Sequence, residues 1–277
     1  MATLQLDPAT LNAMRQLLQG KNRKWATPGD MAQHLDPDTI QTPALQLIDQ
    51  TLIDTTNTTD GRAIITLPPQ EGKSQRVSRR YPLWTLTHNP NTRIAIVSYS
   101  HAVARRWGRT IRDDITTHPD LGLTIRPDLS AQHEWQLAEA QGGVYTTGIG
   151  GSLTGRPVDL LIIDDPIKDR EQADSTIYRN RVWDWWTDVA STRLAPGAPV
   201  ILILTRWHQD DLAGRLLNAP DGHRWKLLNI PAQAETSNDP LGRKPGQWLQ
   251  SSRRRTTKQW EAIKQQAGSR TFNSLYQ

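Results

Sequence analysis

Three short polar groups in this sequence have the residue types that nucleotide phosphate chemistry needs. The first is Gly72-Lys73-Ser74, which follows the apolar run 63–67 and precedes a segment that can be helical. A turn between a strand and a helix leaves backbone N–H groups free to bind phosphate. Lys73 would then contact the β- and γ-phosphates, and the Ser74 hydroxyl would bind Mg²⁺. Because Leu67 replaces the first glycine of G-x-x-x-x-G-K-[ST], this motif alone is weak evidence.

The second group is a pair of adjacent carboxylates, Asp164 and Asp165, at the end of the mainly apolar run 158–163. Nearly continuous Leu and Ile predicts a strand that is covered on both faces, as in a parallel sheet. At the carboxyl end of that strand, Asp164 can hold Mg²⁺ directly or through water, and Asp165 can polarise an attacking water. Asp-Asp-Pro also ends strands and begins turns without any catalytic role. Its position downstream of the Gly-Lys-Ser triplet favours the catalytic interpretation.

The third group, Thr205-Arg-Trp-His208, ends another apolar run at 199–204. Thr205 could sense the γ-phosphate, although a β-branched residue at a strand end needs no such role. Ligands of open α/β sheets collect beyond the carboxyl ends of the strands. Three apolar strands that end in this chemistry together predict an α/β enzyme that hydrolyses a nucleoside triphosphate.

The same residues resemble the ATPase domain of tailed-bacteriophage terminase large subunits, the motors that pump DNA into empty capsids. The segments that carry the resemblance are Pro68-Pro-Gln-Glu-Gly-Lys-Ser74, Leu160-Leu-Ile-Ile-Asp-Asp-Pro166 and Thr205-Arg-Trp-His-Gln-Asp-Asp-Leu-Ala-Gly-Arg215. Further similarity lies in 92–100, 150–156, 182–186 and 274–277, so it covers nearly the whole chain. The resemblance implies a RecA-like (ASCE) P-loop NTPase with a mostly parallel central sheet, flanking helices and a small lid or linker subdomain.

The resemblance also implies roles for particular residues. Lys73 and Ser74 would bind phosphate and metal, Asp164 would coordinate Mg²⁺, Asp165 would take the catalytic carboxylate position, and Thr205 would couple hydrolysis to movement. The implied nucleotide contacts are Pro69, Gln70, Glu71, Gly72, Lys73, Ser74 and Gln41. The implied cofactors are ATP and Mg²⁺. The implied partners are double-stranded DNA, a portal protein and a small terminase subunit.

Two departures from the family pattern affect the site. Many relatives have glutamate where this chain has the shorter Asp165, and relatives commonly carry an arginine in the phosphate loop, where this chain has residues 69–71. The charge that stabilises the transferring phosphoryl group must then come from elsewhere. Arg156 resembles the trans-acting arginine finger of a neighbour in a homo-oligomeric ring, although an isolated domain could be monomeric. Arg156 could instead pair only with a nearby carboxylate.

Charge and composition narrow the function classes. The net charge is +5, and the region after Asp239 carries many Lys and Arg residues against the single acid Glu261. Arg253, Arg254 and Arg255 are candidate DNA contacts, since phosphate contacts need no base-reading motif. Such a run can equally be a solvated face. With no cysteine there are no disulfides, and no apolar run approaches the ~20 residues of a membrane span. The resemblance implies a protein of the host cytoplasm, docked transiently on the viral procapsid.

The expected organisation has three parts. Residues 1–60 form an N-terminal helical segment packed on the core, with helices over 7–20 and 43–53. Residues 61–217 form the P-loop ATPase core, and 218–277 form a lid or linker that leads to a nuclease domain absent from this chain, so no nuclease activity is expected. The alternative functions are a helicase-like DNA translocase and a weakly hydrolysing, nucleotide-gated scaffold protein.

Three segments have further expectations attached. The Gly- and Thr-rich segment 142–155 predicts either a mobile loop near phosphate or DNA, or a hairpin. A helix is predicted over 171–193, with its tryptophans packed against the sheet or, alternatively, stacked on DNA bases. A short polar helix is predicted over 256–267.

Overall fold

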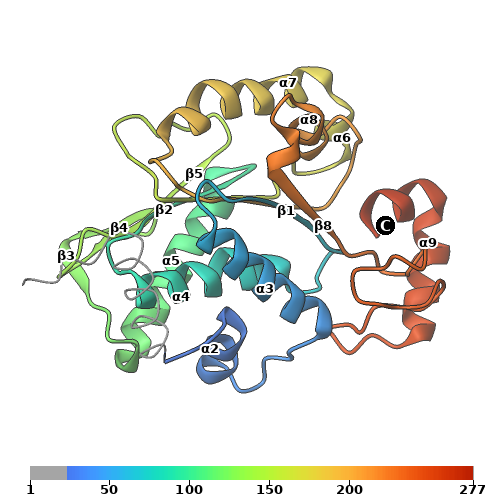
Figure 1. Cartoon of the computed structure of the whole chain (residues 1–277), viewed down its shortest axis with the longest axis horizontal. Coiled ribbons are helices and arrows are strands. Elements are labelled where there is room, and N and C mark those ends of the chain that lie inside the picture. The colour runs from blue at the N-terminus through green and yellow to red at the C-terminus, as the bar shows by residue number, and fades with distance from the viewer. Residues whose placement is uncertain (1–23, 277) are drawn as a thin grey trace, which may run out of the picture.

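The computed structural model describes residues 24–276, and this part of the chain contains one sheet of eight strands (Figure 1). The strand order is β3-β4-β5-β2-β6-β7-β1-β8. The strands are β1 Arg62–Thr66, β2 Arg93–Ser98, β3 Ile125–Ser130, β4 Glu134–Leu137, β5 Gly143–Gly148, β6 Leu160–Asp164, β7 Val200–Leu204 and β8 Trp225–Asn229. All neighbours from β5 to β8 are parallel, whereas β3 and β4 are antiparallel to their neighbours. The predicted mostly parallel α/β sheet is therefore confirmed.

Helices cover both faces of this sheet (Figure 1). On one side lie α2 Pro28–Leu35, α3 Pro43–Asn57, α4 Tyr81–His88 and α5 His101–Thr117. On the other side lie α6 Arg170–Asp174, α7 Thr176–Asp184 and α8 Leu212–Asn218. Parallel strands need such crossover helices, because a tight turn can join only antiparallel neighbours.

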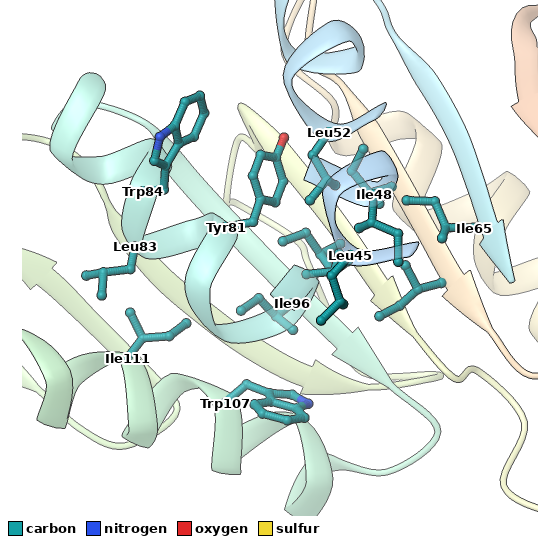
Figure 2. Close-up of a cluster of buried hydrophobic side chains, with 14 of the residues drawn as sticks. Leu45, Ile48, Leu52, Ile65, Tyr81, Leu83, Trp84, Ile96, Trp107 and Ile111 are labelled. Carbon is teal, nitrogen blue, oxygen red and sulfur yellow. The ribbon is translucent and has the colours of Figure 1, made fainter. Parts of the chain in front are cut away.

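The central strands are apolar along their length because consecutive residues enter different cores. Ile64 packs into the core under α6–α8, and Ile65 packs into the core under α3–α5. Figure 2 shows the second core, in which Ile65 and Ile96 of the sheet meet Leu45, Ile48 and Leu52. Burying each such side chain contributes roughly 1.5–3 kcal/mol. The two-sided burial holds the strand ends in fixed relative positions.

Of the two helices predicted before the first strand, one lies within the described residues. The predicted helix 43–53 is confirmed and extends to Asn57; Thr42 caps it by accepting from the backbone N–H of Leu45, and Pro43 occupies its first turn. The predicted helix 7–20 lies outside the described residues. α3 packs against the sheet through Leu45, Ile48 and Leu52, so it belongs to the main core.

The interpretation of 142–155 as a mobile loop is wrong for residues 143–148. They form β5, which pairs with β2 on one side and with β4 on the other. β5 does belong to a hairpin, but its partner strand β4 precedes the segment 142–155 in which the alternative interpretation placed the whole hairpin. Its glycines serve close packing: a Cβ on Gly143 would lie 2.2 Å from the carbonyl oxygen of Trp135. The glycines of this segment thus allow close approach of backbones, not a mobile loop.

The predicted helix 171–193 is broken into shorter pieces. Ser175 has extended backbone angles and caps α7 by accepting from the N–H of Tyr178, so α6 and α7 are separate. A π-helical segment, Trp185–Ala190, follows α7 directly. Trp185 and Trp186 are buried, which confirms packing in the core.

Residues 230–276 form a C-terminal unit beside the layered core (Figure 1). Its helix α9, Thr257–Leu275, is longer than predicted and kinks at Gly268, which has φ +69°. Trp248 stacks on Trp260 with ring centroids 6.0 Å apart, and Phe272 lies against Trp248 at 6.1 Å. No helix within residues 24–276 is long and apolar enough to cross a membrane.

Candidate nucleotide-binding site

Side chains from three neighbouring strands meet at the carboxyl edge of the sheet. β6, β7 and β1 are consecutive in the strand order, and the predicted residues lie at or beyond the last positions of these strands. The amino group of Lys73 donates to Asp165 Oδ2 at 2.9 Å and to Thr205 Oγ1 at 3.1 Å. Ser74 Oγ donates to Asp164 Oδ1 at 3.0 Å. The five residues that sequence reasoning selected for catalysis and metal binding at this edge therefore lie in one cluster.

The phosphate loop, residues 67–74, turns sharply between β1 and the following helix. Gln70 has φ +66° and Gly72 has φ +92°, so two residues adopt the left-handed region. Lys73 and Ser74 begin the helical stretch that continues through the π-helical segment Gln75–Arg80 into α4. Peptide dipoles place partial positive charge at such a helix start, which favours phosphate there.

Asp164 is buried and hydrogen bonded through both oxygens, with Ser78 Oγ donating to Oδ2 at 2.8 Å. Burial, followed by the charge of Asp165, raises the pKa of Asp164 to about 6. The Asp164 carboxylate and the Ser74 hydroxyl place two hard oxygen donors side by side. This donor set fits Mg²⁺, which commonly takes one or two protein oxygens and completes its octahedron with phosphate and water.

Asp165 stands in a strained conformation that its neighbours maintain. Its φ is +45°, which is uncommon outside glycine. The backbone N–H of Thr205 donates to Oδ1 at 2.8 Å, while Lys73 binds Oδ2. This left-handed turn directs the carboxylate toward Lys73 and Thr205 and away from the Asp164 oxygens that Ser74 and Ser78 bind.

The side chain of Gln41 is hydrogen bonded to other protein residues at both of its polar atoms. Its amide nitrogen donates to Asp49 Oδ2 at 2.8 Å, and its oxygen accepts from Arg76 Nη2 at 2.6 Å. Arg76 and Asp49 also form a buried ion pair with each other. Gln41 therefore has both polar ends engaged with the protein, and the predicted adenine contact would require it to exchange partners.

A cavity of about 370 Å³ adjoins the loop beside these residues. It is lined by Gly72 and Gln75 of the loop and helix, by Ile40 and Leu45, and by Ser252 from the C-terminal unit. Its mixed polar and apolar lining at the phosphate loop is the kind of environment that a nucleoside occupies.

Arg156 lies apart from the cluster, over strands β4 and β5. It contacts Glu134 through two nitrogen–oxygen distances of 3.1 Å and covers the ring of Tyr145 at 4.2 Å. The hydrogen bond to Glu134 raises the pKa of Arg156. The pairing with a nearby carboxylate is therefore present in the single chain, and the arginine-finger role stays a prediction that concerns a neighbouring copy.

The three candidate DNA-binding arginines separate into two kinds. Arg253 and Arg254 are exposed, whereas Arg255 binds Glu71 and Gln70 of the phosphate loop. Sequence reasoning missed this contact and the role of Ser78. The available signal was the acid in the loop itself, since a carboxylate in a phosphate site needs a cationic partner.

A parallel sheet with a phosphate loop and two aspartates at its carboxyl edge defines a RecA-like P-loop domain. A family model described as "Terminase large subunit, T4likevirus-type, N-terminal" matches residues 64–271. Since this is most of the sequence, the chain belongs to the terminase large subunit family.

A solved large terminase shows the same fold. The large terminase of bacteriophage HK97 is 18% identical with a TM-score of 0.56, and the match covers 86% of this chain and 50% of that chain. This chain thus spans half the length of that relative. An ATPase-domain mutant of the Thermus phage P74-26 large terminase gives 12% identity, a TM-score of 0.48 and coverage of 74% and 87%. Among curated proteins, none matches this chain.

A large terminase from a thermophilic bacteriophage, solved in complex with ADP, is also similar. It is 10% identical with a TM-score of 0.46, and the match covers 79% of this chain and 50% of that chain.

Proposed function

We propose that this domain hydrolyses ATP to drive double-stranded viral DNA into a procapsid, as the ATPase part of a terminase large subunit. The observation that carries the proposal is the convergence of Lys73, Ser74, Asp164, Asp165 and Thr205 on one edge of the sheet. The family membership supports the same activity.

The contacts of Lys73 suggest how the site works. Its charge is balanced by Asp165, and the β- and γ-phosphates of a nucleotide would compete for the same amino group. Once Lys73 moves to phosphate, Asp165 Oδ2 becomes free to accept a hydrogen bond from water. The N–H of Thr205 continues to hold Oδ1, so the carboxylate keeps its orientation. One displacement would therefore link substrate binding to preparation of the water.

Ser74 and Asp164 are the residues that would hold Mg²⁺. Bound there, the ion would neutralise the negative charge that develops on the phosphates. Ser78 fixes the second oxygen of Asp164, which keeps the carboxylate oriented whether or not the ion is present.

The DNA-facing part of the proposal rests on exposed positive charge. Arg253 and Arg254 are exposed, and so are Arg105, Arg106 and Arg109 on α5. These side chains could contact DNA phosphates without reading sequence, with binding that weakens as salt rises. The portal protein and the small terminase subunit are the proposed protein partners. A homo-oligomeric ring, with Arg156 reaching a neighbour's site, would operate in the host cytoplasm on the procapsid.

Steady-state ATP hydrolysis as a function of protein concentration tests this function. Lys73→Ala should reduce turnover by at least 10²-fold, because its charge is lost from the transferring phosphate. In a ring with shared sites, specific activity should rise with concentration and should fall in Arg156→Ala. Activity proportional to concentration and unchanged in Arg156→Ala would contradict the finger. No Mg²⁺-dependent hydrolysis in any condition, with DNA present or absent, would favour the scaffold protein.

A further inference from the structure

Glu71 brings a negative charge into the phosphate loop, where it opposes the charge of the substrate. Its carboxylate is buried at 2% exposure. It accepts from Ser251 Oγ at 2.9 Å, from the backbone N–H of Ser252 at 2.8 Å and from Ser252 Oγ at 3.3 Å. It also forms an ion pair with Arg255. Every one of these donors comes from residues 251–255, about 180 positions further along the chain.

The same segment binds the preceding loop residue. Arg255 Nη2 donates to Gln70 Oε1 at 3.0 Å. Gln70 is the residue with φ +66°, a conformation that costs of order 1 kcal/mol or more for a side chain with a Cβ. Such strain persists only where surrounding contacts hold it. Residues 251–255 therefore grip the phosphate loop at its strained turn, immediately before Gly72 and Lys73.

The gripping segment is itself anchored in the C-terminal unit. Arg255 lies over the Trp260 ring at 5.2 Å, and Trp260 Nε1 donates to the carbonyl oxygen of Leu249 at 3.1 Å. The backbone N–H of Arg254 donates to the carbonyl oxygen of Ser251 at 3.0 Å, which closes a tight turn. Through these contacts, the position of the phosphate loop depends on the folded state of residues 230–276.

The charges of Glu71 and Arg255 indicate that this contact favours nucleotide binding. An unpaired carboxylate at position 71 would repel the phosphates of ATP, whereas the Arg255 guanidinium neutralises it. The grip also keeps the carboxylate turned toward residues 251–255, so that the loop's N–H groups are left for phosphate. Removing Arg255 would thus harm nucleotide binding in two ways, by freeing the loop and by uncovering a negative charge.

We propose that Arg255 is a positioning residue for the phosphate loop. We also propose that residues 251–255 couple nucleotide binding to the folded state of the C-terminal unit, residues 230–276. The proposal rests on the nucleotide-binding function proposed above. Coupling of this kind is reciprocal. If the ordered C-terminal unit favours nucleotide binding, bound nucleotide must stabilise the C-terminal unit by the same factor.

Equilibrium binding of a fluorescent ATP analogue with Mg²⁺ tests the positioning role. Arg255→Ala should raise the dissociation constant roughly 10- to 100-fold, because a buried carboxylate loses its charged partner. Arg255→Lys should recover part of the loss, since lysine restores charge but not the two-pronged contact. Lys258→Ala is the matched control: it removes an exposed positive charge three residues away and should leave binding within twofold of wild type.

A double-mutant cycle with Glu71→Gln separates a specific pair from general damage. If Arg255 acts through Glu71, then Arg255→Ala should weaken binding less than about threefold in the Glu71→Gln background. If Arg255→Ala does not fold, Arg255→Lys and Glu71→Gln decide the question with the same assay. Equal losses from Arg255→Ala in both backgrounds would overturn the proposal.

Hydrogen exchange gives a readout that does not depend on activity. The nucleotide analogue should slow exchange of the Ser252 amide, which is hydrogen bonded to Glu71, in wild type and in Lys258→Ala. This protection should be reduced in Glu71→Gln, because the amide oxygen can still accept one hydrogen bond but no longer pairs with the charge of Arg255. If the exchange rate of the Ser252 amide is the same with and without the nucleotide analogue, the proposed coupling is wrong. If wild type binds no nucleotide, or binds it equally well after Lys73→Ala, the proposed function fails first. Binding that requires Lys73 but not Arg255 rejects only the positioning role.

Discussion

The phosphate loop is held from two sides by regions of very different construction. The carboxyl edge of the sheet contacts it through Lys73 and Ser74, and those contacts come from the ends of strands buried on both faces. The C-terminal unit contacts it through Gln70 and Glu71, and those contacts come from a turn supported by an aromatic cluster.

This difference suggests separate roles, with the strand ends suited to the hydrolysis step and the C-terminal unit suited to responding to bound nucleotide. Strands packed between two helical layers open only with the whole core, so their carboxylates stay in place through a reaction. The C-terminal unit is smaller than the sheet core, and we expect it to open at a lower free energy, although its Leu249, Trp260 and Phe272 belong to the same buried cluster as α3. Its grip on the loop is thus suited to changing with nucleotide state, whereas the strand-end cluster is suited to staying fixed.

The largest expected effect lies at the strand edge. Asp165→Asn keeps the size of the side chain but removes the carboxylate that we propose orients water, so kcat should fall about 10²- to 10⁴-fold. Nucleotide affinity should change far less, because Asp165 competes with phosphate for Lys73. Single-turnover hydrolysis and analogue binding measure the two quantities separately. Asp128→Asn, which removes an exposed acid paired with Arg126, is the control. A kcat within tenfold of wild type would remove Asp165 from the mechanism.

The next effect compares the stability of the two regions directly. Trp260→Ala should cost about 3–5 kcal/mol of packing in the C-terminal unit, and Ile162→Ala about 2–5 kcal/mol in the sheet. Hydrogen exchange should show faster opening only of residues 230–276 for Trp260→Ala, with β6 still protected. Ile162→Ala should accelerate exchange across both regions. If Trp260→Ala also opens β6, the two regions unfold as one unit and the comparison fails.

The smallest effect concerns an ion pair beside the strand edge. Arg215, and then Arg179, lower the pKa of Asp210 to about 2. A pKa lowered in the folded state adds stability above the unfolded value of about 3.9, and this is lost as pH falls toward 2. Since Asp210 is 46% exposed, the contribution at neutral pH should stay below about 1 kcal/mol. Denaturant unfolding should show Asp210→Asn converging on wild type between pH 5 and pH 2.5. A gap that is constant over that range would contradict the pairing.

Local patterns were sufficient for the central elements. The apolar runs before Lys73, Asp164 and Thr205 each became a buried parallel strand, since uninterrupted Ile and Leu fit a strand only when both faces are covered. Local sequence patterns did not predict the structure where contacts between distant segments override the conformational preference of the residues themselves. Gly143 lies against the backbone of β4 and Gly148 against that of residues 100–101, and the break between α6 and α7 lies at the capping Ser175.

The sequence by itself determined the parallel sheet, the phosphate loop and the residues that gather at its carboxyl edge. Strand burial and strand direction place those residues together, whatever the rest of the chain does. Only the tertiary structure decided the partners of Gln41, Arg156, Glu71 and Arg255. Each of these side chains is long and polar, and its partner is selected by charge and distance among residues far apart in the chain. The run of three arginines predicts one surface from the sequence, whereas in the folded chain Arg255 contacts Gln70 and Glu71.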